Sequence, residues 1–261
     1  MTRLLSGLVL IAAMLAAVWY APPPVFLLVI GLVLAAACLE LSRLMVQSRV
    51  GMAPYAPAAG ALVACAAVAR PGPHTGPVLL GTVLALLMTE LLTRKPAPDV
   101  PAAVAAAVFP IAYLAVPLGL TAVIRDAWGR EALLLGLLVV WISDTAQFYV
   151  GSALGRHRLA PLISPKKSVE GAVGGFLAGV AAMVAIGRYW LPALGIPALA
   201  AAGAALVALG IAGDLFESLL KRSANVKDSS ALIPGHGGAL DRIDALLFVV
   251  PGYYLILTLV A

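Results

Sequence analysis

The sequence is poor in charge and in cysteine. Only 11% of its 261 residues are Asp, Glu, Lys or Arg, whereas soluble domains hold about 25%. Apolar residues of the AVILMFWYC set make up 62%, and the mean hydropathy is +1.04. A water-soluble globular protein is therefore excluded. The two cysteines, Cys38 and Cys65, lie inside apolar runs, so we expect small hydrophobic residues there and no disulfide or metal site.

Long apolar runs account for most of the chain. A helix needs about 20 mostly apolar residues to cross the roughly 30 Å hydrocarbon core of a bilayer. The predicted spans are residues 4–20, 25–41, 53–69, 76–92, 102–124, 132–151, 171–190, 192–212 and 245–260. A cleaved signal peptide is the alternative for the first run, but the proline-linked second run favours a helical hairpin. The sequence thus predicts an all-α, polytopic integral membrane protein with about nine transmembrane helices.

The positions of Lys and Arg predict the orientation. With nine spans and the N-terminus in the cytoplasm, 13 of the 17 Lys and Arg residues lie on the inner side. This agrees with the rule that cytoplasmic loops are enriched in positive charge. We expect one membrane domain, 1–261, in the cell membrane. Residues 1–131 would be a helical scaffold, and 132–261 would carry a site that faces the cytoplasm.

The first polar loop, residues 151–171, follows Asp144, a lone acidic residue in an apolar run. An intramembrane carboxylate is costly unless paired, so Asp144 is either a bundle contact or a cation site. Two hydroxyls and two ammonium groups precede the next predicted helix, whose free N–H groups favour phosphate. The candidate phosphate-binding residues are Ser164, Lys166, Lys167 and Ser168. Anchoring by positive charge and helix packing through the following glycines are the alternatives for this pattern.

The second polar segment begins within the eighth span. On a helix, Asp214, Glu217, Ser218 and Lys221 share one face because they lie at i, i+3, i+4 and i+7. An amphipathic helix end with internal ion pairs would give the same pattern. A glycine-rich stretch follows, in which Gly235, Gly237 and Gly238 let the backbone approach a ligand closely. His236, between them, can donate or accept a hydrogen bond.

Asp241 and Asp244, just before the last span, can present two oxygens to one cation. Hard oxygen ligands with few histidines and no thiols favour Mg²⁺ over zinc.

The stretch from Ser218 to Asp244 resembles the signature of the phosphatidate cytidylyltransferase family, also called CDP-diacylglycerol synthase. That signature reads S-x-hydrophobic-K-R, four residues, K-D, then P-x-H-G-G, a hydrophobic residue, and x-D-R-hydrophobic-D. Every polar position of it is present here. Residues 144–149 and 164–171, and the opening hairpin that ends at Glu40, are also similar to the family. The departures are Ala239, where a larger aliphatic residue is usual, and Ser168, where threonine is commoner.

The resemblance implies Mg²⁺-dependent transfer of CMP from CTP to phosphatidic acid, which yields CDP-diacylglycerol and pyrophosphate. It implies metal binding by Asp214, Asp241 and Asp244, with Asp144 as a further ligand or as the holder of a second cation. Lys221 would act with these carboxylates in catalysis. The implied contacts to the phosphates and the nucleotide are Ser164, Lys166, Lys167, Ser168, Ser218, Arg222, Lys227, His236, Gly237, Gly238 and Arg242. No general base is assigned, because a phosphomonoester with a second pKa of about 6 is already largely ionised at neutral pH.

Two other functions remain open from the sequence. A CTP-dependent kinase of a membrane isoprenoid alcohol would share a multi-span frame and a cytoplasmic nucleotide site. A membrane transporter would place its ionisable residues near the midplane and often shows internal repeats. A CDP-alcohol phosphotransferase would need a D-G-x-x-A-R motif, which is absent. We expect CTP, phosphatidic acid and the bilayer as partners, with a homodimer as one oligomeric state and no nucleic-acid partner.

Overall fold

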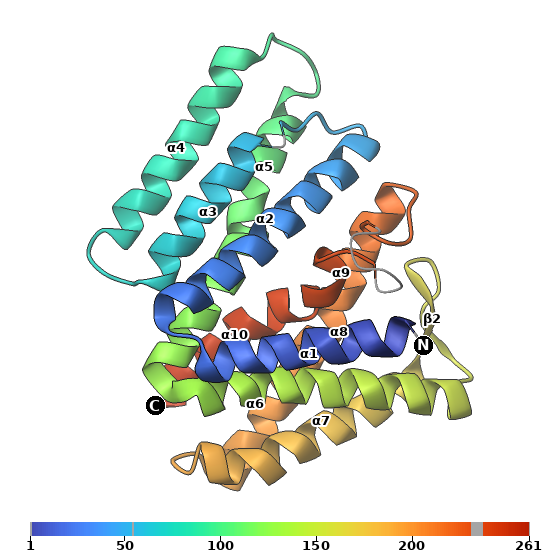
Figure 1. Cartoon of the computed structure of the whole chain (residues 1–261). Coiled ribbons are helices and arrows are strands. Elements are labelled where there is room, and N and C mark those ends of the chain that lie inside the picture. Colours follow the sequence, from blue (N-terminus) through green and yellow to red (C-terminus); the bar gives the residue numbers. More distant parts are fainter. Residues whose placement is uncertain (1, 54, 231–236, 261) are drawn as a thin grey trace. The chain divides into compact units, whose positions relative to one another are not determined.

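The computed structural model describes residues 2–53, 55–230 and 237–260, and they are mostly helical (Figure 1). The elements in chain order are α1 (Thr2–Tyr20), α2 (Pro23–Gln47), α3 (Tyr55–Ala69), α4 (Thr75–Thr93), α5 (Val100–Pro110), the π-helical turn η1 (Ile111–Ala115), α6 (Val116–Leu154), β1 (Arg158–Ala160), β2 (Ser164–Ser168), α7 (Val169–Trp190), α8 (Ile196–Ser223), α9 (Leu240–Ile243) and α10 (Leu246–Val260).

Among the residues that the structure describes, six helical segments are long and apolar enough to cross a membrane, so this is a multi-pass membrane protein. They are Pro23–Gln47, Thr75–Thr93, Val100–Leu154, Val169–Trp190, Ile196–Ser223 and Leu240–Val260. The other predicted spans fall on α1, on the 15-residue α3, and on two parts of the Val100–Leu154 segment. That segment contains a break at Gly129, whose φ of 91° lies outside the helical region. Since L-residues rarely adopt this conformation, glycine suits the break.

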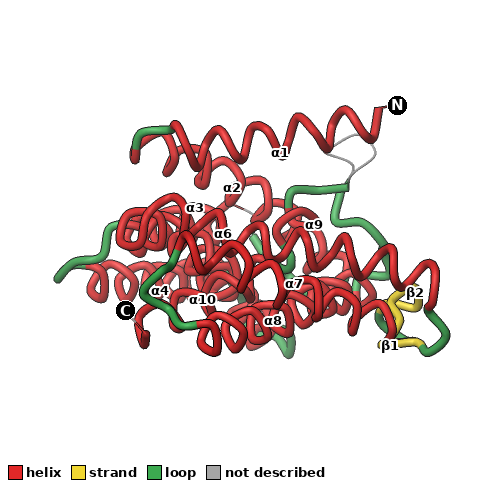
Figure 2. The backbone as a smooth tube through the Cα atoms, turned by 90° about the horizontal axis from the view of Figure 1, so that it is seen from below, coloured by secondary structure: helices red, strands yellow, loops and turns green. Residues whose placement is uncertain are grey.

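Within the described residues the chain is mostly helical, as the all-α expectation requires, but a short β-hairpin also occurs that the sequence did not predict. Strands β1 and β2 form an antiparallel pair in which Arg158 lies opposite Ser168 and Ala160 opposite Ser164. Figure 2 shows this hairpin in yellow beside otherwise helical backbone. The strands have only three and five residues. A strand that short, polar and interrupted by proline shows no alternation of apolar residues, which is the pattern that reveals strands in a sequence.

The chain divides into two compact units, each built from two stretches of sequence. Unit 1 comprises residues 1–123 and 220–243, and unit 2 comprises 124–219 and 244–261. In unit 1, α2 packs on α3, α3 packs on α4, and α2 also contacts α9. Near the C-terminal end of α4, Arg94 pairs with the buried Glu90 and donates to the backbone oxygen of Gly51 (2.5 Å).

Unit 2 packs its helices closely through glycines. A Cβ atom on Gly175 of α7 would lie 2.8 Å from the backbone oxygen of Ser143 on α6. One on Gly174 would lie 2.6 Å from Cγ2 of Val150. Both distances are too short for a side chain, so these glycines let α7 approach α6 within one chain. The packing alternative for the glycines that follow residue 168 is therefore confirmed.

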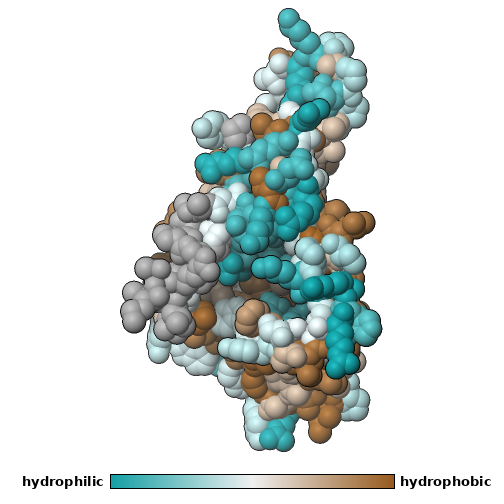
Figure 3. All heavy atoms as spheres, turned by 90° about the vertical axis from the view of Figure 1, so that its right-hand side faces the viewer, coloured by the Kyte–Doolittle hydropathy of each residue, from teal (hydrophilic) through white to brown (hydrophobic). Residues whose placement is uncertain are grey.

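Hydrophilic side chains are not spread evenly over the surface. On the face that Figure 3 shows, they occupy much of the area, with exposed hydrophobic residues beside them. Exposed apolar residues are abundant elsewhere, as on α4, where Leu80, Leu84 and Leu91 are all more than half exposed. Side chains of this kind are stable against lipid.

Candidate active site

An ammonium group and two carboxylates lie together in unit 2. Nζ of Lys167 lies 2.5 Å from Oδ2 of Asp214. Asp144 also interacts electrostatically with this pair, attracted by Lys167 and repelled by Asp214. The amide of Gln147 donates to Oδ1 of Asp144 (3.1 Å). The structure thus brings together three of the predicted site residues: Asp144 from α6, Lys167 from β2 and Asp214 from α8.

The hairpin holds Lys167 in place. The carboxylate of Glu170 accepts hydrogen bonds from the backbone N–H groups of Arg156 (3.0 Å) and His157 (3.2 Å), and it contacts Nδ1 of His157 (2.6 Å). Ser168 caps α7, because its Oγ accepts a hydrogen bond from the N–H of Gly171 (3.1 Å). Lys167 therefore lies within the paired strand β2, one residue before the cap of α7, and both neighbours restrain its backbone.

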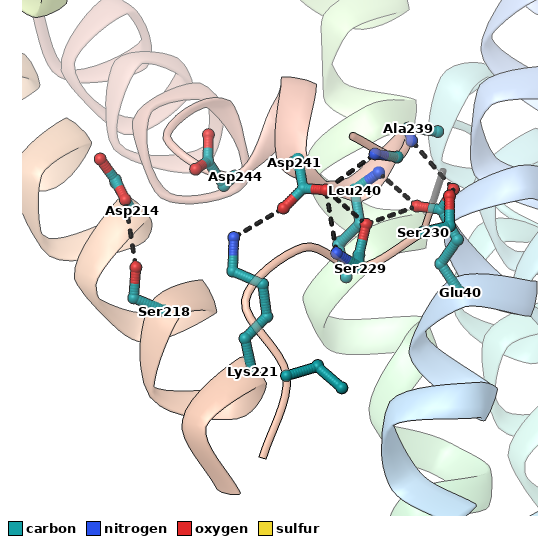
Figure 4. Close-up of polar contacts among 12 residues, drawn as sticks. Glu40, Asp214, Ser218, Lys221, Ser229, Ser230, Ala239, Leu240, Asp241 and Asp244 are labelled. Carbon is teal, nitrogen blue, oxygen red and sulfur yellow. Dashed lines mark hydrogen bonds and ion pairs between the residues drawn. The ribbon is translucent and has the colours of Figure 1, made fainter. Parts of the chain in front are cut away.

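Asp244 belongs to the same unit and lies near α8. A Cβ atom on Gly213 would lie 2.7 Å from the backbone oxygen of Asp244, so the residue before Asp214 packs directly against Asp244. Oδ1 of Asp244 accepts from the N–H of Ala245 (2.7 Å). Ser218, one turn after Asp214, donates a long hydrogen bond to it (3.4 Å; Figure 4).

The carboxylates of unit 2 fit the way proteins hold magnesium. Within the described residues, no group of three or more His, Cys, Asp or Glu side chains is arranged to hold a metal ion by itself. Mg²⁺ is usually bound through one or two carboxylates together with substrate phosphates, so a complete protein cage is not required. Asp144 and Asp214 supply two carboxylates beside a cationic group, Lys167. That donor set suits Mg²⁺.

In unit 1, the predicted metal ligand Asp241 is fully occupied by protein groups. Its Oδ2 accepts from the Ser229 N–H (3.0 Å), the Ser229 hydroxyl (2.8 Å) and the Gly238 N–H (2.7 Å). Its Oδ1 lies 2.6 Å from Nζ of Lys221, and both side chains are nearly buried, at 6% and 12% exposure (Figure 4). Asp241 would have to give up Lys221 to bind a cation.

The remaining predicted residues are placed as follows. Four basic side chains are exposed and thus accessible to an anion: Lys166, Arg222, Lys227 and Arg242. Ser164 is half-buried at the start of β2. Gly237 has φ of 79°, and a Cβ atom there would lie 2.5 Å from Oδ2 of Asp241. A Cβ atom on Gly238 would collide with Ser229 and Glu40. His236 lies outside the described residues.

Sequence reasoning did not include Glu40 among the site residues. It lies in the apolar helix α2, is 2% exposed, and accepts hydrogen bonds from residues on both sides of 231–236. The signal was present, because a lone carboxylate in an apolar span is as costly there as at Asp144. The same argument applied to residue 40 would have predicted a buried polar contact.

Comparisons with known proteins connect the chain to one family. The model of the Cytidylyltransferase family matches residues 1–260. A protein named phosphatidate cytidylyltransferase from Bacillus subtilis (strain 168) is 41% identical over 136 residues, which cover 51% of this chain and 50% of that protein. Proteins of the same name from Haemophilus influenzae (43% over 127 residues; 47% of this chain, 44% of theirs) and Staphylococcus epidermidis (39% over 123 residues; 47% of each) are also similar. The chain spans about half the length of the curated relatives it matches. Because the family model covers nearly every residue, the chain belongs to the Cytidylyltransferase family.

Proposed function

We propose that this chain transfers CMP from CTP to phosphatidic acid, giving CDP-diacylglycerol and pyrophosphate. The observation that carries the proposal is the group formed by Lys167, Asp214 and Asp144 in unit 2. It combines a cation for phosphate with two carboxylates for a metal, and the cation, Lys167, lies directly before the capped helix α7. The shared family and the name of the similar relatives support the same activity.

The proposed chemistry is an in-line displacement at phosphorus. An oxygen of the phosphatidate phosphate forms a bond to the α-phosphorus of CTP, and the bond from that phosphorus to the bridging β-oxygen breaks. The difficulty is bringing two polyanions together, since phosphoryl transfer depends mainly on positioning and charge neutralisation. We assign this neutralisation to Lys167 and Lys221, with the exposed Lys166, Arg222, Lys227 and Arg242 as additional contacts to phosphate.

Magnesium is part of the proposal. Asp144, Asp214 and Asp244 of unit 2 would hold it. The resemblance also implies Asp241 as a ligand, but in unit 1 that carboxylate is paired with Lys221. When bound, Mg²⁺ neutralises charge on the triphosphate. The chain's own residues orient the reactants: Ser168 and Gly171 start the helix that follows Lys167, and Ser218 keeps the Asp214 carboxylate oriented.

We propose nine membrane crossings with the N-terminus in the cytoplasm and the site on the cytoplasmic side of the cell membrane. The distribution of Lys and Arg supports this orientation. CTP and Mg²⁺ are cytoplasmic, and phosphatidic acid can enter laterally from the inner leaflet. A homodimer remains a prediction that cross-linking in native membranes tests.

The test is an assay of the purified protein in lipid-replete detergent micelles with labelled CTP and Mg²⁺. The CTP is labelled in parallel at the α- or the γ-phosphate, because cytidylyl transfer moves the first and a kinase moves the second. Phosphatidic acid is one acceptor, and dolichol and phytol are offered separately. We expect CDP-diacylglycerol from phosphatidic acid and no labelled product from the alcohols. A product formed only from an alcohol would favour the isoprenoid kinase, and a folded protein that labels none of the acceptors would overturn the proposal.

A further inference from the structure

Glu40 is a buried carboxylate in an otherwise mostly apolar helix. It lies in α2 and is 2% exposed. Burying an ionised group costs several kcal/mol unless hydrogen bonds replace the lost water. The structure therefore has to supply donors at this position.

Four donors, all in unit 1, reach the Glu40 carboxylate. Oε1 accepts from the Ser230 hydroxyl (2.7 Å) and the Ala239 N–H (3.0 Å). Oε2 accepts from the Leu240 N–H (2.8 Å) and is 3.0 Å from the Ser229 hydroxyl. Figure 4 shows these donors converging on Glu40 from two stretches of the signature segment.

The same contacts lead to the Lys221–Asp241 pair. The Ser229 hydroxyl lies between two carboxylates, 3.0 Å from Glu40 and 2.8 Å from Asp241. Its proton can serve one of them at a time, while its N–H stays bound to Asp241. Asp241 in turn contacts Lys221 at 2.6 Å. A displacement of Glu40 would therefore move Ser229, and with it the groups that orient Lys221.

We infer that Glu40 is a positioning residue: from α2, it holds Ser229–Ser230 and Ala239–Leu240 and so sets the position of Lys221 and Asp241. The inference rests on the proposed function, because it assigns those two residues to the cytidylyl transfer. An acceptor-only side chain is required here, since four donors point at it. Glutamine would turn its NH₂ group toward some of those donors, and aspartate is shorter by one methylene group.

The experiment compares Glu40→Gln with Glu90→Gln in the full chain. Glu90 is a matched control because it too is a buried glutamate of an apolar helix in unit 1, but it pairs with Arg94 away from the signature segment. Both variants lose a buried carboxylate and its hydrogen bonds. Hydrogen exchange without substrate, Tm, and kcat and KM for CTP are measured for each.

For Glu40→Gln, we expect the Ala239 and Leu240 amides to exchange about 10-fold faster. These two amides donate to Glu40, so the substitution should lower the free energy of their local opening. We expect kcat to fall about 10- to 100-fold, the usual cost of losing a group that orients functional residues. Both variants should lower Tm by similar amounts, because each loses a buried carboxylate. In Glu90→Gln, however, kcat should stay within twofold of the wild-type value. Ser230→Ala, which keeps the carboxylate and removes one donor, should give an intermediate loss of kcat.

Unchanged exchange at Ala239 and Leu240 in Glu40→Gln would overturn the inference, and so would faster exchange with normal kcat. An equal loss of kcat in Glu90→Gln would also overturn it, because the effect would then be general destabilisation. If Glu40→Gln does not fold, Ser230→Ala is tested in its place. Unchanged exchange at Ala239 and Leu240, or a normal kcat, in that variant would overturn the inference. Failure of the proposed function is separate, since it would appear as an inactive wild type, and the exchange measurement would still test whether Glu40 holds the segment.

Discussion

Lys167 and Asp214 form an ion pair of 2.5 Å between a strand of the hairpin and the eighth helix. The two residues are far apart in the sequence, and both side chains are less than one-third exposed. Partial burial strengthens their attraction compared with a pair in water. The pair therefore connects the predicted phosphate-binding loop to the predicted metal-binding helix within unit 2.

Removal of the Lys167 charge should reduce turnover without unfolding the protein. Lys167→Met should lower kcat about 100-fold, the cost typical of losing one group that stabilises developing charge. Arg188→Gln removes one positive charge from the same unit, on the predicted outer side, and should leave kcat within twofold. Steady-state kinetics of both variants check this prediction. A wild-type kcat in Lys167→Met would show that Lys167 does not belong to the site.

Turnover should require Mg²⁺, and the Mg²⁺ concentration for half-maximal activity should depend on Asp144. Chelation of divalent cations should abolish activity, and Mg²⁺ should restore it. Asp144→Asn should raise the Mg²⁺ concentration for half-maximal activity about 10-fold, since a metal-binding carboxylate is lost. Asp126→Asn, an exposed acidic residue on the predicted outer side, is the control. An unchanged Mg²⁺ requirement in Asp144→Asn would exclude Asp144 as a ligand.

The close approach of α7 and α6 predicts a stability effect that does not depend on the activity. Gly175→Ala places a Cβ atom 2.8 Å from the Ser143 backbone oxygen, and overpacking of this kind costs about 1–3 kcal/mol. Tm in detergent should fall. The same substitution at Gly76, where nothing lies within 4 Å, should leave Tm unchanged or raise it slightly. Equal Tm values for the two variants would contradict the described packing.

The proposed orientation can be tested with single cysteines. Cys38 and Cys65 are buried and can be replaced by alanine. His74→Cys is exposed between α3 and α4, on the predicted outer side, and Leu162→Cys is exposed in the hairpin, on the predicted inner side. In right-side-out vesicles, an impermeant maleimide should label residue 74 at once and residue 162 only after permeabilisation. The reverse order would show that the orientation is inverted.

Local patterns in the sequence predicted much of the fold and part of the site. Apolar length predicted helices at each of the nine ranges, and spacing placed Asp214 and Ser218 on one helical face, where the structure joins them by a hydrogen bond. The helix start after Ser168 was also predictable from its polar residues.

Contacts between distant segments were not predictable. The Glu40 carboxylate meets Ser229 and Leu240 almost two hundred residues later in the chain, and no local pattern encodes that pairing. The pairing of Asp241 with Lys221 was also missed, because a carboxylate in such a pattern fits a metal ligand and an ion-pair partner equally well.

The central claim is that the chain transfers a cytidylyl group rather than a terminal phosphate. The most direct measurement incubates the purified protein with phosphatidic acid, Mg²⁺ and CTP labelled in parallel at the α- or the γ-phosphate. Cytidylyl transfer predicts lipid labelled only from α-labelled CTP, with the γ-label released as pyrophosphate. Lipid labelled from γ-labelled CTP would show phosphoryl transfer and contradict the account.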